Sequence, residues 1–241
     1  MLKYFLLAAR SGCFYLGLLL IVIASGVTSC FIWGLPLIHR QRIAVASNYL
    51  VLNWLRLTCG VKVNLSGLQN LPTGACVILS NHQSAWESFY IQWLVRPASF
   101  VLKRELLWLP FFGWSISAME PIAIKRSKPA AAMRQVLKQG RDRLGRGIKV
   151  VIYPEGTRNP AGKLGSFKTG GAALAKLSGV AIVPLAHNAG EHWPADTWLK
   201  SPGTINVHIG PALDSSIYTT RELTDKAHAW VASSLNTTSC Q

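Results

Sequence analysis

The chain has 241 residues, of which 50% are hydrophobic, enough for one sizeable domain with a full core. Its 25 Lys and Arg residues outnumber 10 Asp and Glu residues, and the net charge of +15 favours nucleic acid, an anionic membrane or a phosphorylated substrate as partner. Nine tryptophans and a mean hydropathy of +0.26 favour the membrane, and five cysteines without a C-x-x-C pair argue against a disulfide framework or a zinc site.

The first long apolar segment, Ser11–Ile38, carries no charged residue and is flanked by basic residues on both sides. As one helix it would extend roughly 42 Å at about 1.5 Å per residue, more than the ~30 Å hydrocarbon core of a bilayer. It therefore either spans the membrane with tilt or breaks near Gly34-Leu35-Pro36 and lies partly in the interface. Because it is longer than the apolar part of a signal peptide, we expect it to anchor the protein.

Residues Gln41–Thr58 predict a second, partly amphipathic helix, which either lies on the membrane or is an ordinary core helix. A strand is expected at Val61–Leu65, followed by the turn-rich residues Gly67–Gly74.

From residue 76 onward, short β-branched runs alternate with helical segments. This alternation predicts an α/β fold with a mostly parallel, mixed sheet flanked by helices, whose ligands bind beyond the carboxyl ends of the strands. The expected strands are Cys76–Ser80, Ser99–Lys103, Pro121–Lys125, Lys149–Tyr153, Ala181–Ala186 and Thr204–Ile209. The expected helices are Ser84–Leu94, Pro110–Met119, Pro129–Leu144, Thr169–Leu177 and Glu222–Leu235.

A basic segment lies between Lys125 and Lys149, where nine basic residues, including Arg126, accompany one acid, Asp142. It predicts a solvated surface, a contact with anionic lipid head groups or a nucleic-acid contact. The chain has no nucleic-acid reader motif and no pattern of stacking aromatic residues. We therefore expect no nucleic-acid partner.

Two residues with acid–base chemistry, His82 and Glu87, follow the apolar run Cys76–Ser80 at the start of a predicted helix. A histidine beside a carboxylate is typical of a general base with an orienting partner. Five positions along a regular helix leave two side chains about 140° apart, so the pair can meet only if His82 precedes the helix and Glu87 lies in its first turn. The alternative is structural: Ser84-Ala85-Trp86-Glu87 fits a capping box, in which Glu87 accepts a backbone N–H.

A second motif, Tyr153-Pro154-Glu155-Gly156-Thr157-Arg158, follows another apolar strand-like run. Gly156 lets the backbone come close to a ligand, Thr157 adds a hydroxyl, and Arg158 adds a planar fork suited to phosphate. An ordinary Pro-Gly turn with a surface arginine is the alternative.

These two motifs belong to a series of four. His82 with Glu87 is followed by Lys103-Arg104-Glu105 leading to residues 109–113, then by Tyr153–Arg158, then by Val180–Pro184. Over residues 76–190 the series resembles the four blocks of the glycerolipid acyltransferase family, most closely its bacterial 1-acyl-sn-glycerol-3-phosphate acyltransferases. The family's first block, N-H-x-x-x-x-D, has Asp where this chain has Glu87. Its third block, F-P-E-G-T-R-S, has Phe and Ser where Tyr153 and Asn159 stand.

The resemblance implies an O-acyltransferase with a membrane anchor and amphipathic helix at residues 1–60 and a catalytic domain at residues 61–241. It implies that His82 takes the proton of an acceptor hydroxyl as that oxygen attacks an acyl thioester, while Glu87 orients the imidazole. Glu155 would orient the loop that follows it. No metal and no cofactor are implied. The residues that would hold an acceptor phosphate are Lys103, Gly156, Thr157 and Arg158.

The resemblance also implies lysophosphatidic acid as acceptor, phosphatidic acid for phospholipid biosynthesis as product, and acyl-CoA or acyl carrier protein as donor. Membrane lipids would be partners, and the location would be a bacterial inner membrane with the catalytic domain on the cytoplasmic face. Another lysolipid acceptor is one alternative, and a non-enzymatic membrane-bound lipid-binding protein is another. His187, just past the fourth block, could line the site.

Overall fold

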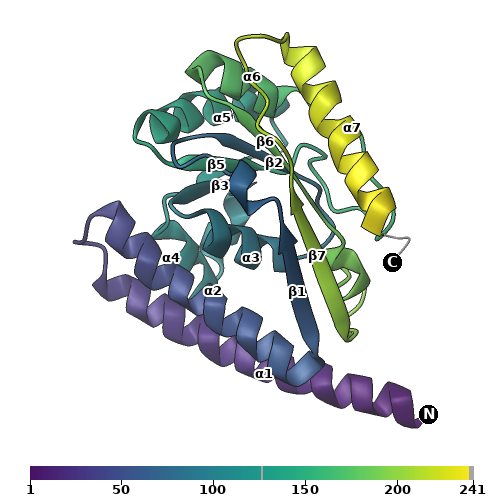
Figure 1. Ribbon diagram of the computed structural model, residues 1–241. Coiled ribbons are helices and arrows are strands. Elements are labelled where there is room, and N and C mark those ends of the chain that lie inside the picture. The colour runs from purple at the N-terminus through teal and green to yellow at the C-terminus, as the bar shows by residue number, and fades with distance from the viewer. Residues whose placement is uncertain (126, 239–241) are drawn as a thin grey trace.

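The computed structural model describes residues 1–125 and 127–238, so Arg126 and Cys240 lie outside the described residues. Its strands are β1 (Val61–Ser66), β2 (Val77–Ser80), β3 (Ala98–Lys103), β4 (Ile122–Ile124), β5 (Lys149–Ile152), β6 (Ile182–His187) and β7 (Gly203–Ile209). They form one seven-stranded sheet in the order β1-β7-β6-β2-β5-β3-β4 (Figure 1). Only β6 and β7 are antiparallel neighbours, so the predicted mixed, mostly parallel α/β sheet is confirmed.

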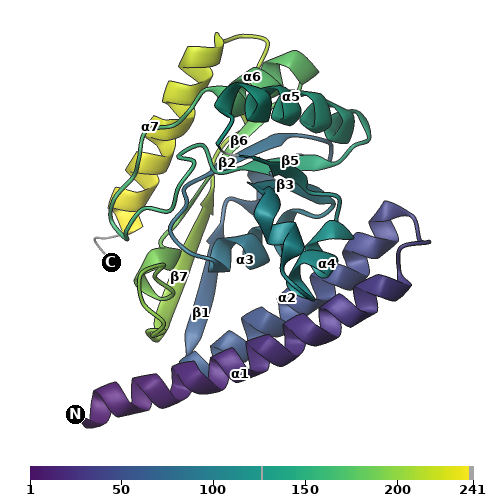
Figure 2. The same cartoon turned by 180° about the vertical axis from the view of Figure 1, so that it is seen from behind.

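Helices cover both faces of the sheet. The helices are α1 (Leu2–Phe31), α2 (Leu37–Cys59), α3 (Trp86–Val95), α4 (Phe112–Ser117), α5 (Pro129–Gly145), α6 (Gly170–Ser178) and α7 (Thr220–Thr238). Helices α5, α6 and α7 lie on one face, and α1 to α4 lie on the other (Figures 1 and 2). In β2, Ile78 joins the core under α3, while Val77 and Leu79 join the core under α6. Burial on both faces explains why the central strands are continuously apolar.

The predicted elements are all present, with ends that differ by a few residues. The predicted helix Pro110–Met119 is longer at both ends than α4, which covers only Phe112–Ser117. Phe111, with φ of 60°, precedes α4, and Glu120, with φ of 52°, follows shortly after it. Neither backbone conformation is helical for an L-residue, so the helix is confined between them. A 3₁₀ turn, Arg104–Trp108, comes before it.

The N-terminal apolar segment forms a helix, a break and a second helix. Helix α1 begins at Leu2, earlier than the uncharged run, and ends at Phe31. The chain then turns and re-enters a helix after Pro36, so the break near Gly34-Leu35-Pro36 is present, while the position of the segment in the membrane stays a prediction. Helix α1 is long and apolar enough to cross a membrane. The close packing of α1 requires Gly26, where an added Cβ would lie 2.4 Å from the Cα of Phe111.

The pair α1–α2 has one face in the core and one face exposed. Phe14 and Leu55 are fully buried and belong to the core under α3. Large apolar side chains on the opposite face are exposed, among them Leu20, Leu50 and Leu57. Helix α2 is therefore partly amphipathic, as predicted, with one side in the core; contact of its exposed side with a membrane stays a prediction. The division into an anchor at 1–60 and a catalytic domain at 61–241 stays a prediction.

Most of the basic segment forms helix α5. Helix α5 lies on the face of the sheet opposite α1 and α2 in both views (Figures 1 and 2). Lys149 is buried, and Arg143 and Arg146 pair with Glu120, which also binds Arg40 of α2 at 2.6 Å. Burial alone would raise the pKa of Glu120, but these arginines outweigh burial and lower it. This placement favours a structural and solvated role for the segment over contact with lipid head groups.

Candidate active site

The two acid–base residues of the first motif are in contact. His82 lies in the turn after β2, and Glu87 lies in the first turn of α3. The Nδ1 atom of His82 and the Oε1 atom of Glu87 are 2.5 Å apart. Glu87 has no solvent exposure, while His82 is 8% exposed. This is the one arrangement in which their spacing along the chain permits contact.

Glu87 also caps the helix with the same oxygen. Its Oε1 accepts the backbone N–H of Ser84 at 3.1 Å and of Gln83 at 3.3 Å. The Ser84 hydroxyl in turn accepts the backbone N–H of Trp86 at 3.0 Å. The capping and histidine-pairing interpretations are therefore not exclusive, because one carboxylate oxygen serves both.

The hydrogen bond to Glu87 determines what His82 can do. The carboxylate accepts the proton of Nδ1, so the neutral ring carries its lone pair on Nε2. Among the described residues Nε2 has no hydrogen-bond partner. The Tyr153 ring stacks on the imidazole, with centroids 4.2 Å apart and planes at 12°. Burial, and secondarily the Glu87 charge, raises the pKa of Tyr153 well above its usual range, so Tyr153 is neutral beside the base.

Glu155 joins the second motif to the turn of His82. Its carboxylate accepts the backbone N–H of His82 at 2.6 Å and of Gly165 at 2.7 Å, and the side-chain amide of Asn159. The Asn159 backbone N–H donates to the His82 carbonyl at 2.8 Å. These bonds fix the backbone on both sides of the imidazole. Glu155 thus lies where the sequence analysis expects an orienting residue.

The predicted phosphate-binding residues gather at the carboxyl edge of β3 and β5. Gly156 adopts φ of 75°, and Thr157 and Arg158 follow it, both exposed. Lys103 ends β3, which pairs with β5. Within the described part of the chain, Lys103 and Arg158 form no ion pair with a carboxylate. The structure brings these cations to one edge of the sheet without recording a contact between them.

Lys168 is a further cation at this edge that the sequence analysis did not identify. A Cβ at Gly156 would lie 3.0 Å from its Nζ, so the ammonium sits against the Gly156 backbone. The Lys168 backbone N–H donates to the carbonyl of Pro154 at 3.0 Å. Lysine ten residues beyond the motif carries no sequence signal, because its position depends on how the loop folds back.

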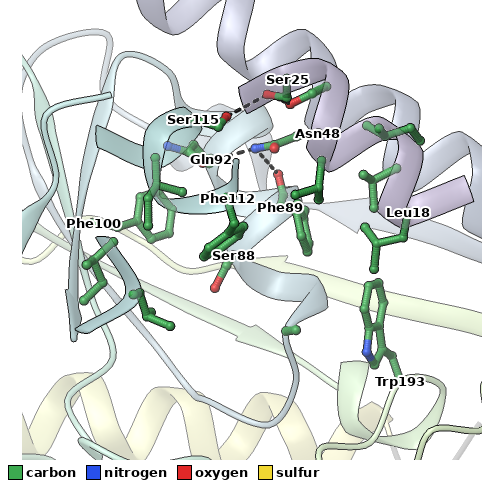
Figure 3. Close-up of a pocket in the computed structure, with 18 of the residues that line it drawn as sticks. Leu18, Ser25, Asn48, Ser88, Phe89, Gln92, Phe100, Phe112, Ser115 and Trp193 are labelled. Carbon is green, nitrogen blue, oxygen red and sulfur yellow. Dashed lines mark hydrogen bonds between the residues drawn. The ribbon is translucent and has the colours of Figure 1, made fainter. Parts of the chain in front are cut away.

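An apolar cavity of about 470 Å³ opens beside these groups. Tyr153 and Arg158 line it on the side of the candidate base. The other lining side chains are mostly apolar and come from α1, α2, α3, α4, β3 with the 3₁₀ turn after it, Pro121 and the segment after β6. Those labelled in Figure 3 include Leu18, Phe89, Phe100, Phe112 and Trp193. The sequence does not indicate the cavity, because its walls come from segments that lie far apart in the chain.

Polar side chains close the cavity at the α1 side. The hydroxyls of Ser25 and Ser115 are 2.6 Å apart, and the Asn48 amide donates to Gln92 at 3.1 Å (Figure 3). Because these groups hydrogen-bond with one another, the remaining lining stays available to an apolar chain. Among the described residues no cluster of three or more His, Cys, Asp or Glu side chains is placed to bind a metal ion.

Known acyltransferases are similar to this chain in sequence. A model of the acyltransferase family matches residues 62–188. A Pseudomonas aeruginosa protein named 1-acyl-sn-glycerol-3-phosphate acyltransferase is 45% identical over 220 residues, which cover 86% of each chain. A chloroplastic protein of the same name from Arabidopsis thaliana is 37% identical over 52% of this chain and 35% of its own length.

The fold has also been seen in a solved structure. The crystal structure of the 1-acyl-sn-glycerophosphate acyltransferase PlsC from Thermotoga maritima superposes with a TM-score of 0.83. The superposition covers 97% of this chain and 96% of that one, at 22% sequence identity. At that identity the likeness supports the fold alone.

Proposed function

The chain belongs to the acyltransferase family and is an O-acyltransferase, and from this premise we propose that it acylates the free hydroxyl of 1-acyl-sn-glycerol-3-phosphate, giving phosphatidic acid. The observation that carries the proposal is the His82–Glu87 pair beside an apolar cavity whose mouth is lined by Arg158. A base, an apolar chain site and a phosphate-binding cation are the three features that this reaction needs.

His82 acts as the general base. Its Nε2 takes the proton of the acceptor hydroxyl as that oxygen bonds to the thioester carbonyl carbon. Glu87 stabilises the imidazolium that forms. The tetrahedral intermediate then breaks its C–S bond, and the sulfur leaves with the proton from His82. The transfer is direct, so it uses neither a serine nor a cysteine nucleophile, and it requires no cofactor or metal.

The cavity holds a fatty acyl chain. Its volume of about 470 Å³ is in the usual range for ligand sites, and its walls are mostly apolar. Each methylene buried there contributes roughly 0.8 kcal/mol. Because the cavity lies against α1 and α2, the chain is held between the catalytic edge of the sheet and the helix pair that contacts lipid.

The cations at the edge of the sheet hold the acceptor phosphate. Arg158 offers a planar fork, and Lys103 and Lys168 add single charges. Gly156, whose own N–H donates to the Tyr153 carbonyl at 3.1 Å, lets the backbone come close to an anion, and Thr157 adds a hydroxyl donor. Glu155 orients this loop through its bonds to His82 and Gly165.

The donor is a thioester of coenzyme A or of acyl carrier protein. The proposed location is a bacterial inner membrane, with α1 and α2 in contact with lipid and the catalytic edge on the cytoplasmic side, where both donors occur. No nucleic-acid partner is proposed.

The function is tested by incubating the purified full chain with a panel of lysolipids and either donor, and following free thiol and lipid products by mass spectrometry. We expect phosphatidic acid from 1-acyl-sn-glycerol-3-phosphate, and no product with His82→Ala. If product formed only with a different lysolipid, that lipid would be the acceptor instead of 1-acyl-sn-glycerol-3-phosphate. Absence of thiol release with every acceptor would overturn the enzymatic proposal in favour of lipid binding.

Arg158→Lys tests the phosphate site. Lysine keeps the charge but loses the two-pronged geometry, so we expect the KM for the phosphorylated acceptor to rise about tenfold or more. The KM for the thioester and the melting temperature should change little. An unchanged acceptor KM would remove Arg158 from the phosphate site.

A further inference from the structure

A second buried histidine faces the free oxygen of Glu87. His187 ends β6, the strand next to β2, and is 1% exposed. While Oε1 of Glu87 has three hydrogen-bond donors, its Oε2 is buried without a partner among the described residues. The Nε2 atom of His187 lies 3.8 Å from that oxygen. A buried carboxylate oxygen without a hydrogen-bond partner is costly, and this imidazole lies close enough to reduce that cost.

The hydrogen bonds of His187 define its tautomer. The backbone N–H of Ala189 donates to Nδ1 at 3.3 Å, so Nδ1 carries no proton. The proton is therefore on Nε2, which donates to the carbonyl of Asn81 at 3.0 Å. Burial lowers the pKa of His187, an effect that the Glu87 charge opposes, so the ring is neutral. This N–H donates to the Asn81 carbonyl, and the Nε2 atom that carries it also lies 3.8 Å from Oε2 of Glu87, beyond hydrogen-bond range but close enough for electrostatic attraction.

Asn81 connects His187 to the candidate base. Its side-chain amide donates to the His187 carbonyl at 2.9 Å, and its side-chain oxygen accepts the His187 backbone N–H at 3.0 Å. With the ring N–H, three hydrogen bonds join these two residues across β2 and β6. Asn81 directly precedes His82, so this connection fixes the start of the turn that carries the imidazole.

We propose that His187 is a positioning residue for the His82–Glu87 pair: it anchors the turn of His82 through Asn81 and holds Glu87 by facing its second oxygen with an N–H. The role rests on the proposed function of His82 as base. When His82 takes the acceptor proton, positive charge appears on its ring. Glu87 stabilises that charge only while its first oxygen stays directed at Nδ1. Rotation of the carboxylate is opposed because its second oxygen would move away from the electropositive Nε2 edge of the His187 ring, which lies 3.8 Å from it.

Other ionisable groups also face His82, and the test has to separate them from His187. Glu87 contacts its ring from α3, and Tyr153 stacks on it from the end of β5. Glu155 binds its backbone N–H from the loop after β5. None of these residues is changed in the experiment below, so differences between variants of His187 report on that residue.

The experiment compares His187→Gln with His187→Leu. Glutamine can place an amide N–H near the position of Nε2, whereas leucine fills similar volume without a donor. For His187→Leu we expect kcat to fall about tenfold to a hundredfold, the scale of a small misplacement of catalytic groups, with both KM values within about twofold. The acid limb of the kcat–pH profile should move to lower pH, because the imidazolium of His82 loses its oriented partner. His187→Gln should recover most of kcat and the original profile.

A purely structural role predicts a different result. It would lower the melting temperature of both variants while leaving kcat per folded molecule and the pH profile unchanged, and that result would overturn the proposal. His208→Leu, which removes a histidine on β7 away from the pair, serves as control and should leave the kinetics unchanged.

A measurement on the unaltered protein keeps the proposal testable if leucine prevents folding. In protein labelled with ¹⁵N-histidine, the His187 shifts should show a protonated Nε2 and a bare Nδ1 from about pH 6 to 9, and Nε2 should respond when His82 titrates. Uptake of a second proton by His187 in that range, or no response to His82, would overturn the role. This measurement needs no turnover, so failure of the proposed acyltransfer would appear separately, as a wild type without product.

Discussion

Glu87 combines two duties in one oxygen, and a single substitution separates them. In Glu87→Gln the amide oxygen can still accept the Ser84 and Gln83 N–H groups, so the cap and the fold should survive. The negative charge that stabilises the His82 imidazolium is lost. If the amide is reversed, its NH₂ group also favours the wrong tautomer. We expect normal folding by circular dichroism and a loss of kcat of at least about a hundredfold.

Glu87→Asp is the matched control, because it keeps the charge on a shorter arm. It should retain measurable turnover, with a lower kcat than the wild type. A Gln variant with near-full turnover would contradict the catalytic pairing and leave Glu87 with the cap alone.

Some residues of the site could be predicted from the sequence, and others could not. His82 and Glu87 were predictable because a strand end and a first helical turn are local features with fixed geometry. The approach of His187 to Glu87 was not, because it depends on β6 lying next to β2. Lys168 and the cavity walls were hidden for the same reason, since no local pattern brings Leu18, Phe112 and Trp193 together.

At the scale of elements, the alternation of strands and helices was sufficient to predict the parallel sheet. The break after Phe31 was predictable only as one of two alternatives. Gly34 and Pro36 permit a turn there, but the packing of α1 on α2 and α4 determines it. The shortness of α4 follows from left-handed backbone at Phe111 and Glu120, which residue identity does not indicate.

The close contact between α1 and Phe111 can be tested by comparing alanine substitutions at Gly26 and Gly12, two glycines of α1. Gly26→Ala places a methyl group against the Phe111 backbone, which cannot rotate away, and should destabilise the protein by about 1–3 kcal/mol. Gly12→Ala meets nothing within 4 Å and should be neutral or slightly stabilising, because alanine favours helix. Thermal unfolding in detergent measures both. Equal melting temperatures for the two variants would contradict the close packing.

Lys200 connects α1 to the segment before β7 and predicts a pH dependence. It is fully buried; its backbone N–H donates to the Ser11 hydroxyl at 2.9 Å, and its Nζ lies 5.0 Å from the Tyr15 ring. Its Nζ donates to the carbonyls of Thr197, Trp198 and Leu199. Burial lowers the pKa of Lys200 to about 8, below the ~10.4 of the unfolded chain.

Between those two pKa values the unfolded state binds more protons than the folded state, so the Lys200 contribution to stability rises with pH from about 8 to about 10.4. Below pH 8, where both states are protonated, the cost of burying the charged amine is present in full and does not vary with pH. We expect the melting temperature of the wild type to rise relative to that of Lys200→Met as the pH increases from about 8 to about 10.4. Parallel curves would show that Lys200 is not desolvated.

At the scale of the whole molecule, the exposed apolar face of α1 and α2 and the basic surface of α5 lie on opposite sides of the sheet. Attachment to the membrane should therefore depend on apolar contact more than on charge. We expect alkaline carbonate or high salt to leave the protein in the membrane pellet and detergent to release it, measured by immunoblotting. Release by salt alone would assign attachment to the basic surface.

Helices α1 and α2 have two roles, and this limits how a soluble form of the enzyme can be obtained. The same two helices expose an apolar face on one side and, through Leu18, Ser25 and Asn48, line the cavity on the other. A fragment beginning at Val61 would lose that wall together with the attachment. A thioester bound to this fragment would then be exposed to water next to His82, the proposed base. We expect such a fragment to hydrolyse the acyl donor. Truncation would then convert a transferase into a slow thioesterase.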